Sequence, residues 1–195
     1  MDVARSSHSV PNFKSPSVRD VVAMLLAARL VHRIDAQDRI LLSRWVLGED
    51  AGALTRWLWI GITQLGSAVF TIGSVLLPWS LGAVPKAVSI RVAAALAISH
   101  VIVQVVKRCV NRERPNCLAL ISLPDRFSFP SGHATASLAI TLSYAIAFPA
   151  FAVFLTGLGL TVGFSRVVLG VHYPGDVAVG QFIAAATVAA IMLFA

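Results

Sequence analysis

Four long stretches of the chain contain no Asp, Glu, Lys or Arg, and they constrain the fold more than any other feature of the sequence. They cover residues 57–85, 92–106, 134–165 and 177–195. A helix needs about 20 consecutive apolar residues to cross the hydrocarbon core of a bilayer. Hydrophobic residues make up 57% of the chain and charged residues only 13%, which is wrong for a soluble domain. The sequence therefore predicts an all-α, multi-pass transmembrane helix bundle.

The uncharged stretches divide into five predicted membrane spans. The stretch 134–165 is too long for one span and has Pro149 near its middle, so we expect two helices that turn at Phe148-Pro149. The five predicted spans cover residues 57–78, 87–106, 132–148, 150–165 and 176–195. Residues 57–195 are thus the predicted transmembrane domain.

The N-terminal part of the chain has a different composition. Residues 1–17 are polar and contain two prolines, so we expect a disordered tail. Residues 18–56 mix apolar and charged side chains, and their apolar run, Val21 to Val31, is short and contains Arg29. This run predicts either an amphipathic helix lying in the membrane interface or a short, degraded first span. A cleaved signal peptide is a third reading, although no clear cleavage context follows.

The net charge of +7 would suggest a nucleic-acid partner for a soluble protein, but the positions of the cations indicate a membrane protein instead. Eight of the sixteen Lys and Arg residues precede residue 57, where anionic headgroups can attract them. The sequence predicts no nucleic-acid partner. The two cysteines, Cys109 and Cys117, lack a CxxC spacing, so they signal neither a metal knuckle nor a disulfide framework.

Two polar loops lie between the predicted spans, at 107–131 and at 166–175. Two helices separate them, so both loops emerge on the same side of the bundle. The first loop starts with Lys107 and Arg114, seven residues apart on a helix that we expect to continue to Pro115. They would share one helix face, about 10 Å apart along the axis. Cations that snorkel at a membrane edge are the alternative.

The first loop ends with Phe129-Pro130-Ser131-Gly132-His133, immediately before an apolar run. The free amides at the start of a helix bind anions, and Gly132 lets a ligand approach the backbone closely. Ser131 can cap the helix or donate to a phosphate oxygen. His133 is an ionisable residue at a membrane edge, which makes it a functional candidate.

The second loop contains Arg166, His172, Pro174, Gly175 and Asp176. Pro174 and Gly175 suit the first turn of the last helix, which leaves His172 just before that helix and Asp176 inside it. Alternatively, a carboxylate near a helix N-terminus only stabilises the helix, through a favourable interaction with the helix dipole. The pattern leaves both readings of Asp176 open.

The three blocks read Lys-x6-Arg-Pro, Pro-Ser-Gly-His and Ser-Arg-x5-His-x3-Asp, in that order. This arrangement resembles the type 2 phosphatidic acid phosphatase family, whose lipid phosphatases share an active site with the vanadium-dependent haloperoxidases. All eleven motif residues are present without substitution. The N-terminal 56 residues depart from the six-span plan that is usual in this family. The resemblance implies a hydrolase with a phosphorylated lipid as its substrate and the membrane as its setting.

The resemblance also implies a role for each motif residue. His172 would attack phosphorus and form a phosphohistidine, and Asp176 would fix its tautomer. His133 would act as general acid and then as general base. The predicted phosphate-binding residues are Lys107, Arg114, Ser131, Gly132 and Arg166.

No metal and no cofactor are expected, because cations and amides already provide the charge that a magnesium ion would supply. His133, His172 and Asp176 could in principle ligate a metal, but no HExxH-like spacing supports this. We assign Arg108, Arg112 and Arg126 to headgroups or solvent. His100 and Gln104 lie on nearly the same face as Lys107, so they either extend a polar stripe into the bundle or, as the plainer role, form interhelical hydrogen bonds.

Two other functions use the same motifs. A phosphotransferase would replace water with a hydroxyl acceptor, and a non-catalytic protein would bind a lipid phosphate without cleaving it. A haloperoxidase is disfavoured because those enzymes are soluble. Within the family, the short chain resembles small bacterial members that act on polyprenyl diphosphates or phosphates.

The resemblance further implies the bacterial inner membrane, with the site near its outer face. If 18–46 lies on the surface, the positive-inside rule favours the cytoplasmic side instead. A spanning Val21–Val31 removes that conflict. The oligomeric state is left open by the sequence.

Overall fold

The computed structural model describes residues 35–48, 50–110, 112–115 and 126–194. Nearly all of these residues belong to one compact unit, Gln37–Ala195. The other unit, Met1–Ala36, is described only at its last two residues. The expected disordered tail at 1–17 and the Val21–Val31 segment both lie outside the described residues.

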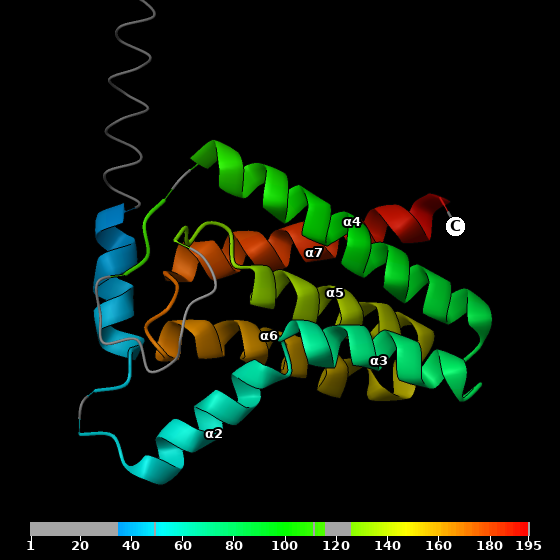
Figure 1. Cartoon of the computed structure of the whole chain (residues 1–195), viewed down its shortest axis with the longest axis horizontal. Helices are drawn as coiled ribbons and strands as arrows, with labels where there is room; N and C mark the ends of the chain where they lie inside the picture. Colours follow the sequence, from blue (N-terminus) through cyan, green and yellow to red (C-terminus); the bar gives the residue numbers. More distant parts are fainter. Residues whose placement is uncertain (1–34, 49, 111, 116–125, 195) are drawn as a thin grey trace, which may run out of the picture. The chain divides into compact units, whose positions relative to one another are not determined.

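Within the described residues the fold is helical, apart from one isolated β-bridge between Glu113 and Phe127. This confirms the predicted helix bundle (Figure 1). The helices are α2 (Ala53–Gln64), α3 (Ala68–Ser80), α4 (Lys86–Val110), α5 (Gly132–Ala147), the 3-10 turn η1 (Pro149–Phe151), α6 (Ala152–Val168) and α7 (Pro174–Phe194).

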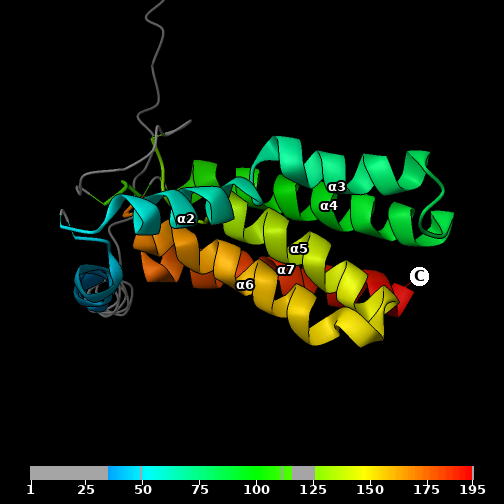
Figure 2. The ribbon, with the colours of Figure 1, turned by 90° about the horizontal axis from the view of Figure 1, so that it is seen from below.

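Helix α5 lies at the centre of the bundle and packs against α4, α6 and α7 (Figures 1 and 2). The buried residues of α5 are mainly small, which allows neighbouring helices to approach closely. Helix α7 approaches α5 in this way at Gly180. A Cβ atom there would lie 2.7 Å from both the Ser131 carbonyl oxygen and Thr135 Oγ1. The N-terminal halves of α5 and α7 are therefore held together.

The predicted turn at Phe148-Pro149 is confirmed. Helix α5 ends at Ala147, and Pro149 opens η1, which leads directly into α6. Proline lacks the amide hydrogen that a continuing helix would need, so one long apolar stretch becomes two antiparallel helices.

The prediction of one continuous helix over 57–78 is wrong. Helix α2 ends at Gln64, α3 begins at Ala68, and the two helices are bent by 52°. Ser67 caps α3 by accepting a hydrogen bond from the Phe70 amide at 3.5 Å. At Gly66 a Cβ atom would lie 2.8 Å from Val162 Cγ1, so the backbone of the break packs tightly against α6. A break of this kind leaves no trace in the hydropathy, because both halves are apolar.

Three helical segments are long and apolar enough to cross a membrane: Lys86–Val110, Pro149–Val168 and Pro174–Phe194. The bent pair α2 and α3 makes a fourth if it counts as one span. Helix α5, with 16 residues, is about 24 Å long, less than the roughly 30 Å of the hydrocarbon core. The predicted number of five spans is therefore not confirmed. Large apolar side chains face outward on these helices, including Val153, Phe182 and Leu193, as expected of an integral membrane protein.

A further helix runs through the described residues 35–45. Its Leu42 is buried in a cluster with Ala134, Val167, Tyr173 and Val177, where α5 and α7 begin and α6 ends. We call this end the site end of the bundle. The Leu47 amide donates to the Val168 carbonyl oxygen at 2.9 Å. Residues 37–47 are thus part of the packed domain, although the sequence placed its start at residue 57.

Candidate active site

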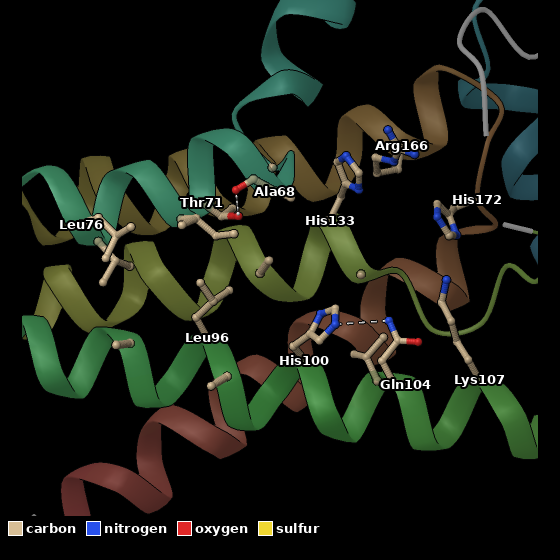
Figure 3. A pocket seen from close by; sticks show the side chains of 18 of the residues that line it. Ala68, Thr71, Leu76, Leu96, His100, Gln104, Lys107, His133, Arg166 and His172 are labelled. Atoms are coloured by element: carbon tan, nitrogen blue, oxygen red, sulfur yellow. Dashed lines mark hydrogen bonds between the residues drawn. The ribbon is translucent and has the colours of Figure 1, made fainter. Parts of the chain in front are cut away.

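A cavity of about 530 Å³ opens at the site end between α3, α4 and α5. Figure 3 shows His133, Arg166, His172 and Lys107 gathered at one end of it, and Leu76 and Leu96 at the other. Six of the eight predicted site residues line this cavity: Lys107, Arg114, Gly132, His133, Arg166 and His172. One polar end and one apolar end suit a molecule with a charged group and a hydrocarbon tail.

His172 sits in the short connection between α6 and α7 and is only 2% exposed. Arg114 holds it from one side, because Arg114 Nη1 lies 3.0 Å from His172 Nε2 and donates to the Val171 carbonyl oxygen at 2.8 Å. Gly170, with φ of 70°, provides the left-handed turn that leads the chain out of α6. Because Arg114 lines the cavity and contacts Nε2, this is the ring nitrogen on the cavity side.

Asp176 lies on the other side of the imidazole ring and is fully buried. Its Oδ2 accepts a hydrogen bond from the Tyr173 amide at 2.9 Å and lies 3.5 Å from His172 Nδ1. A guanidinium can only donate, so Arg114 requires a lone pair on Nε2 and leaves the proton on Nδ1, toward Asp176. The two neighbours thus select one tautomer of His172.

The protonation state of His172 follows from its surroundings. Burial lowers the pKa of His172 to about 4, and the positive charges of Arg114 and Arg166 act in the same direction. The Asp176 carboxylate partly opposes this shift. The ring is therefore neutral at neutral pH, and its Nε2 carries the lone pair that accepts from Arg114.

Two more cations reach the same end of the cavity. Arg166 is 2% exposed, and its Nη1 donates to Thr63 Oγ1 of α2 at 2.8 Å. Lys107 Nζ donates to the Phe127 carbonyl oxygen at 3.5 Å. With Arg114 they place three positive charges around one polar pocket, an arrangement that favours an anionic group. The sequence did not single out Thr63, because nothing marks it among the other hydroxyl residues of the spans.

Ser131 takes the capping role. It is fully buried, is not among the residues that line the cavity, and accepts from the Ala134 amide at 3.5 Å. Its own amide donates to the Asp176 carbonyl oxygen at 3.0 Å. Gly132 does line the cavity, and no described atom lies within 4 Å of a Cβ built there. The open space beside Gly132 is where a ligand can reach the backbone.

Two predictions about the first loop are wrong. Helix α4 ends at Val110 rather than at Pro115, so Arg114 reaches the cavity from a non-helical segment that the Glu113–Phe127 bridge holds in place. Arg112, assigned to headgroups or solvent, instead donates to Asp176 Oδ1 at 2.8 Å and lies 2.9 Å from Asp38 Oδ2. Neither Arg112 nor Asp38 belongs to a recognisable motif, and their spacing along the chain gives no sign that they meet.

Of the remaining residues singled out in the sequence, Arg126 is exposed and pairs with Glu113 at 3.0 Å, and Arg108 is also exposed. His100 and Gln104 lie 3.4 Å apart on the same helix, and both line the cavity beside Lys107 (Figure 3). They extend the polar lining of the cavity along α4.

The chain is similar in sequence to proteins whose names state a phosphatase activity. Decaprenylphosphoryl-5-phosphoribose phosphatase of Mycobacterium tuberculosis is 41% identical over 104 residues, which cover 49% of this chain and 54% of that protein. Lipid A 1-phosphatase of Rhizobium johnstonii is 33% identical over 94 residues, covering 44% of this chain and 38% of that protein. The chain spans only about half, or less, of the length of these relatives.

The fold has solved counterparts. A transmembrane PAP2-type phosphatidylglycerolphosphate phosphatase from Bacillus subtilis matches with a TM-score of 0.72 and 22% identity, covering 89% of this chain and 92% of that one. LpxE of Aquifex aeolicus matches with a TM-score of 0.64 and 22% identity, covering 73% and 88%. The model of the PAP2 superfamily matches residues 89–195, more than half of the chain. The chain belongs to the PAP2 superfamily.

Proposed function

We propose that this protein is an integral-membrane lipid phosphatase that hydrolyses a phosphomonoester or diphosphate through a phosphohistidine intermediate. The observation that carries the proposal is the cavity with a neutral, oriented His172 and three cations at one end and apolar walls at the other. Relatives whose names state phosphatase activity on phosphorylated lipids support it. His172, His133 and Asp176 are the proposed catalytic residues.

In the first step, His172 Nε2 attacks phosphorus, a P–N bond forms, and the P–O bond to the lipid breaks. His133, which also lines the cavity, takes up a proton when the anionic phosphate offsets the nearby cations, and gives that proton to the leaving oxygen. The ring of His172 becomes positively charged as it bonds to phosphorus. Asp176, 3.5 Å from Nδ1, stabilises that charge.

In the second step, water replaces the lipid. His133, now without its proton, takes one from the water, the oxygen attacks phosphorus, and the P–N bond breaks. Inorganic phosphate leaves and His172 returns to its neutral form. Lys107, Arg114, Arg166 and the Gly132 amide stabilise the equatorial oxygens in both steps. Ser131 contributes by capping α5 and so fixing that amide.

The substrate class follows from the shape of the cavity. A volume of about 530 Å³ accommodates a phosphorylated headgroup and the first part of a tail, and the rest of the tail lies in the bilayer. A polyprenyl phosphate or diphosphate fits this description, as does a substrate similar to phosphatidic acid. The name of the mycobacterial relative favours the polyprenyl class.

The test is phosphate release by detergent-purified protein from polyprenyl diphosphate, phosphatidic acid and phosphatidylglycerophosphate, with and without EDTA. We expect turnover of at least one lipid, at a rate that the chelator leaves unchanged, because protein cations perform the role of a metal. Loss of turnover in EDTA would contradict metal independence. Transfer of phosphate only to an added hydroxyl acceptor would make the protein a phosphotransferase, and binding without cleavage would make it a lipid-binding protein.

We place the protein in the inner membrane of a bacterium, with the site near the outer face, as the family resemblance implies. Cys109 is exposed in the last turn of α4, at the site end. In a Cys117→Ser background, a membrane-impermeant maleimide is expected to label Cys109 in intact spheroplasts. Labelling only after permeabilisation would put the site in the cytoplasm, as the cations Arg39 and Arg44 near this end would favour.

A further inference from the structure

Asp38 is a buried carboxylate outside every motif of the site. It lies on the helix through 35–45 and is only 5% exposed. Its Oδ1 accepts a hydrogen bond from the Gly175 amide at 2.8 Å, and its Oδ2 lies 2.9 Å from Arg112 Nη1. A buried carboxylate is costly unless it is paired; Oδ1 of Asp38 has a hydrogen bond, and Oδ2 has the ion-pair contact with Arg112 but no hydrogen bond within the described part of the chain.

The partners of Asp38 lead directly to the proposed catalytic pair. The same Arg112 nitrogen that meets Asp38 also donates to Asp176 Oδ1 at 2.8 Å. The Arg112 guanidinium lies over the Tyr173 ring, 4.2 Å from its centroid, which fixes its plane. Asp176 therefore has one oxygen held by Arg112 and the other beside His172 Nδ1.

The second contact of Asp38 holds the backbone. Gly175 is in the first turn of α7, the helix that carries Asp176, and its amide is one of the free donors at that helix start. A Cβ atom on Gly175 would lie 2.6 Å from Asp38 Oδ2. Only glycine leaves room for this contact, so the fit between Asp38 and the start of α7 is tight on both sides.

We propose that Asp38 is a positioning residue for the His172–Asp176 pair; this inference rests on the proposed phosphatase function. Asp38 shares the positive charge of Arg112, so that Arg112 orients Asp176 without neutralising it. The three side chains Asp38, Arg112 and Asp176 together carry one net negative charge beside a ring that becomes positive during the reaction. Without Asp38 that net charge falls to zero, and Asp176 stabilises the charged ring less well.

The first test is Asp38→Asn. The amide oxygen can still accept from Gly175, but the ion pair with Arg112 is lost, so the variant isolates the charge. We expect kcat to fall roughly 10- to 100-fold, with KM changed by less than about threefold, because the phosphate-binding cations are untouched. Asp50→Asn, an exposed carboxylate that also precedes α2, is the matched control and should retain wild-type kcat. An unchanged kcat in Asp38→Asn would overturn the proposal.

The second test asks whether Asp38 acts through Asp176. In an Asp176→Asn background, adding Asp38→Asn should lower kcat by less than about threefold, because the group that Asp38 positions is already lost. Full multiplication of the two effects would overturn the proposal and leave Asp38 with a separate, structural role. Melting temperatures in detergent, measured for all four proteins, separate these outcomes from simple unfolding.

The third test uses the close approach at Gly175. Gly175→Ala should lower kcat in the wild-type background, because its methyl group pushes Asp38 away. The same change should have a much smaller effect in an Asp38→Ala background, where the clashing carboxylate is absent. Equal losses in both backgrounds would overturn the tight-fit argument. The proposed function is tested separately, by turnover of the wild-type protein and its loss in His172→Ala. A failure of the proposed function is therefore distinguishable from a failure of the inference about Asp38.

Discussion

Alanine in place of His172 is expected to lower phosphate release by about 10⁴-fold or more, the largest effect of any single substitution in this protein. The reason is that the substitution removes Nε2, the atom proposed to bond to phosphorus, which lies 3.0 Å from Arg114 Nη1 in a ring whose Nδ1 lies 3.5 Å from Asp176 Oδ2. The measurement is phosphate release from a lipid substrate, together with ³²P trapped on protein quenched in alkali, where a phosphohistidine survives.

The trapped label makes this result specific. Wild-type protein should carry an acid-labile phosphate during turnover, and His172→Ala should carry none. A folded His172→Ala protein that still forms the labelled intermediate would assign the nucleophile to another residue. Undiminished turnover in this variant would refute covalent catalysis by His172 altogether.

Alanine in place of His133 is expected to lower the cleavage of an alkyl phosphate by roughly 10²- to 10⁴-fold, because the leaving alkoxide then departs without a proton. The loss should be much smaller in the first step for p-nitrophenyl phosphate, whose leaving group needs no general acid. Release of the intermediate also needs His133 as a base. We therefore expect a burst of p-nitrophenol, stoichiometric with the protein, followed by slow turnover, measured by stopped-flow absorbance.

The two histidine variants control for each other. The His133→Ala protein should accumulate the labelled phosphohistidine that His172→Ala cannot form, which shows that the cavity still binds phosphate. Equal losses for alkyl and aryl phosphates in His133→Ala, without a burst, would contradict the proposed proton transfer and leave His133 with a binding role only.

The sequence predicted the residues around the cavity well because their chemistry and their position both stand out. Histidines and arginines that interrupt uncharged stretches are costly in a membrane, and the two loops that carry them had to emerge on one side. His172 before a helix and Asp176 within it followed from Pro174 and Gly175, and α7 does begin at Pro174. The division of 134–165 into two helices followed from Pro149 in the same way.

Other parts of the fold could not be read from the sequence. At the bend between α2 and α3 the backbone of Gly66 packs against α6, a tertiary contact that hydropathy does not report. Asp38 and Arg112 are far apart in the sequence, and no helical or strand periodicity predicts that they pair. Arg112 looked like any cation at a membrane edge, and only its position over Tyr173 and between two carboxylates distinguishes it.

The contacts of Asp38 and Thr63 bear on where a recombinant fragment of this protein can begin. The region that matches the family, residues 89–195, contains every motif residue. It omits Thr63, which binds Arg166, and Asp38, which binds Arg112. A fragment cut at that boundary would retain every motif residue but leave the buried Arg166 and the half-buried Arg112 without these partners. If the proposed function and the inferred role of Asp38 hold, we expect that an active recombinant fragment of this protein must begin before residue 38.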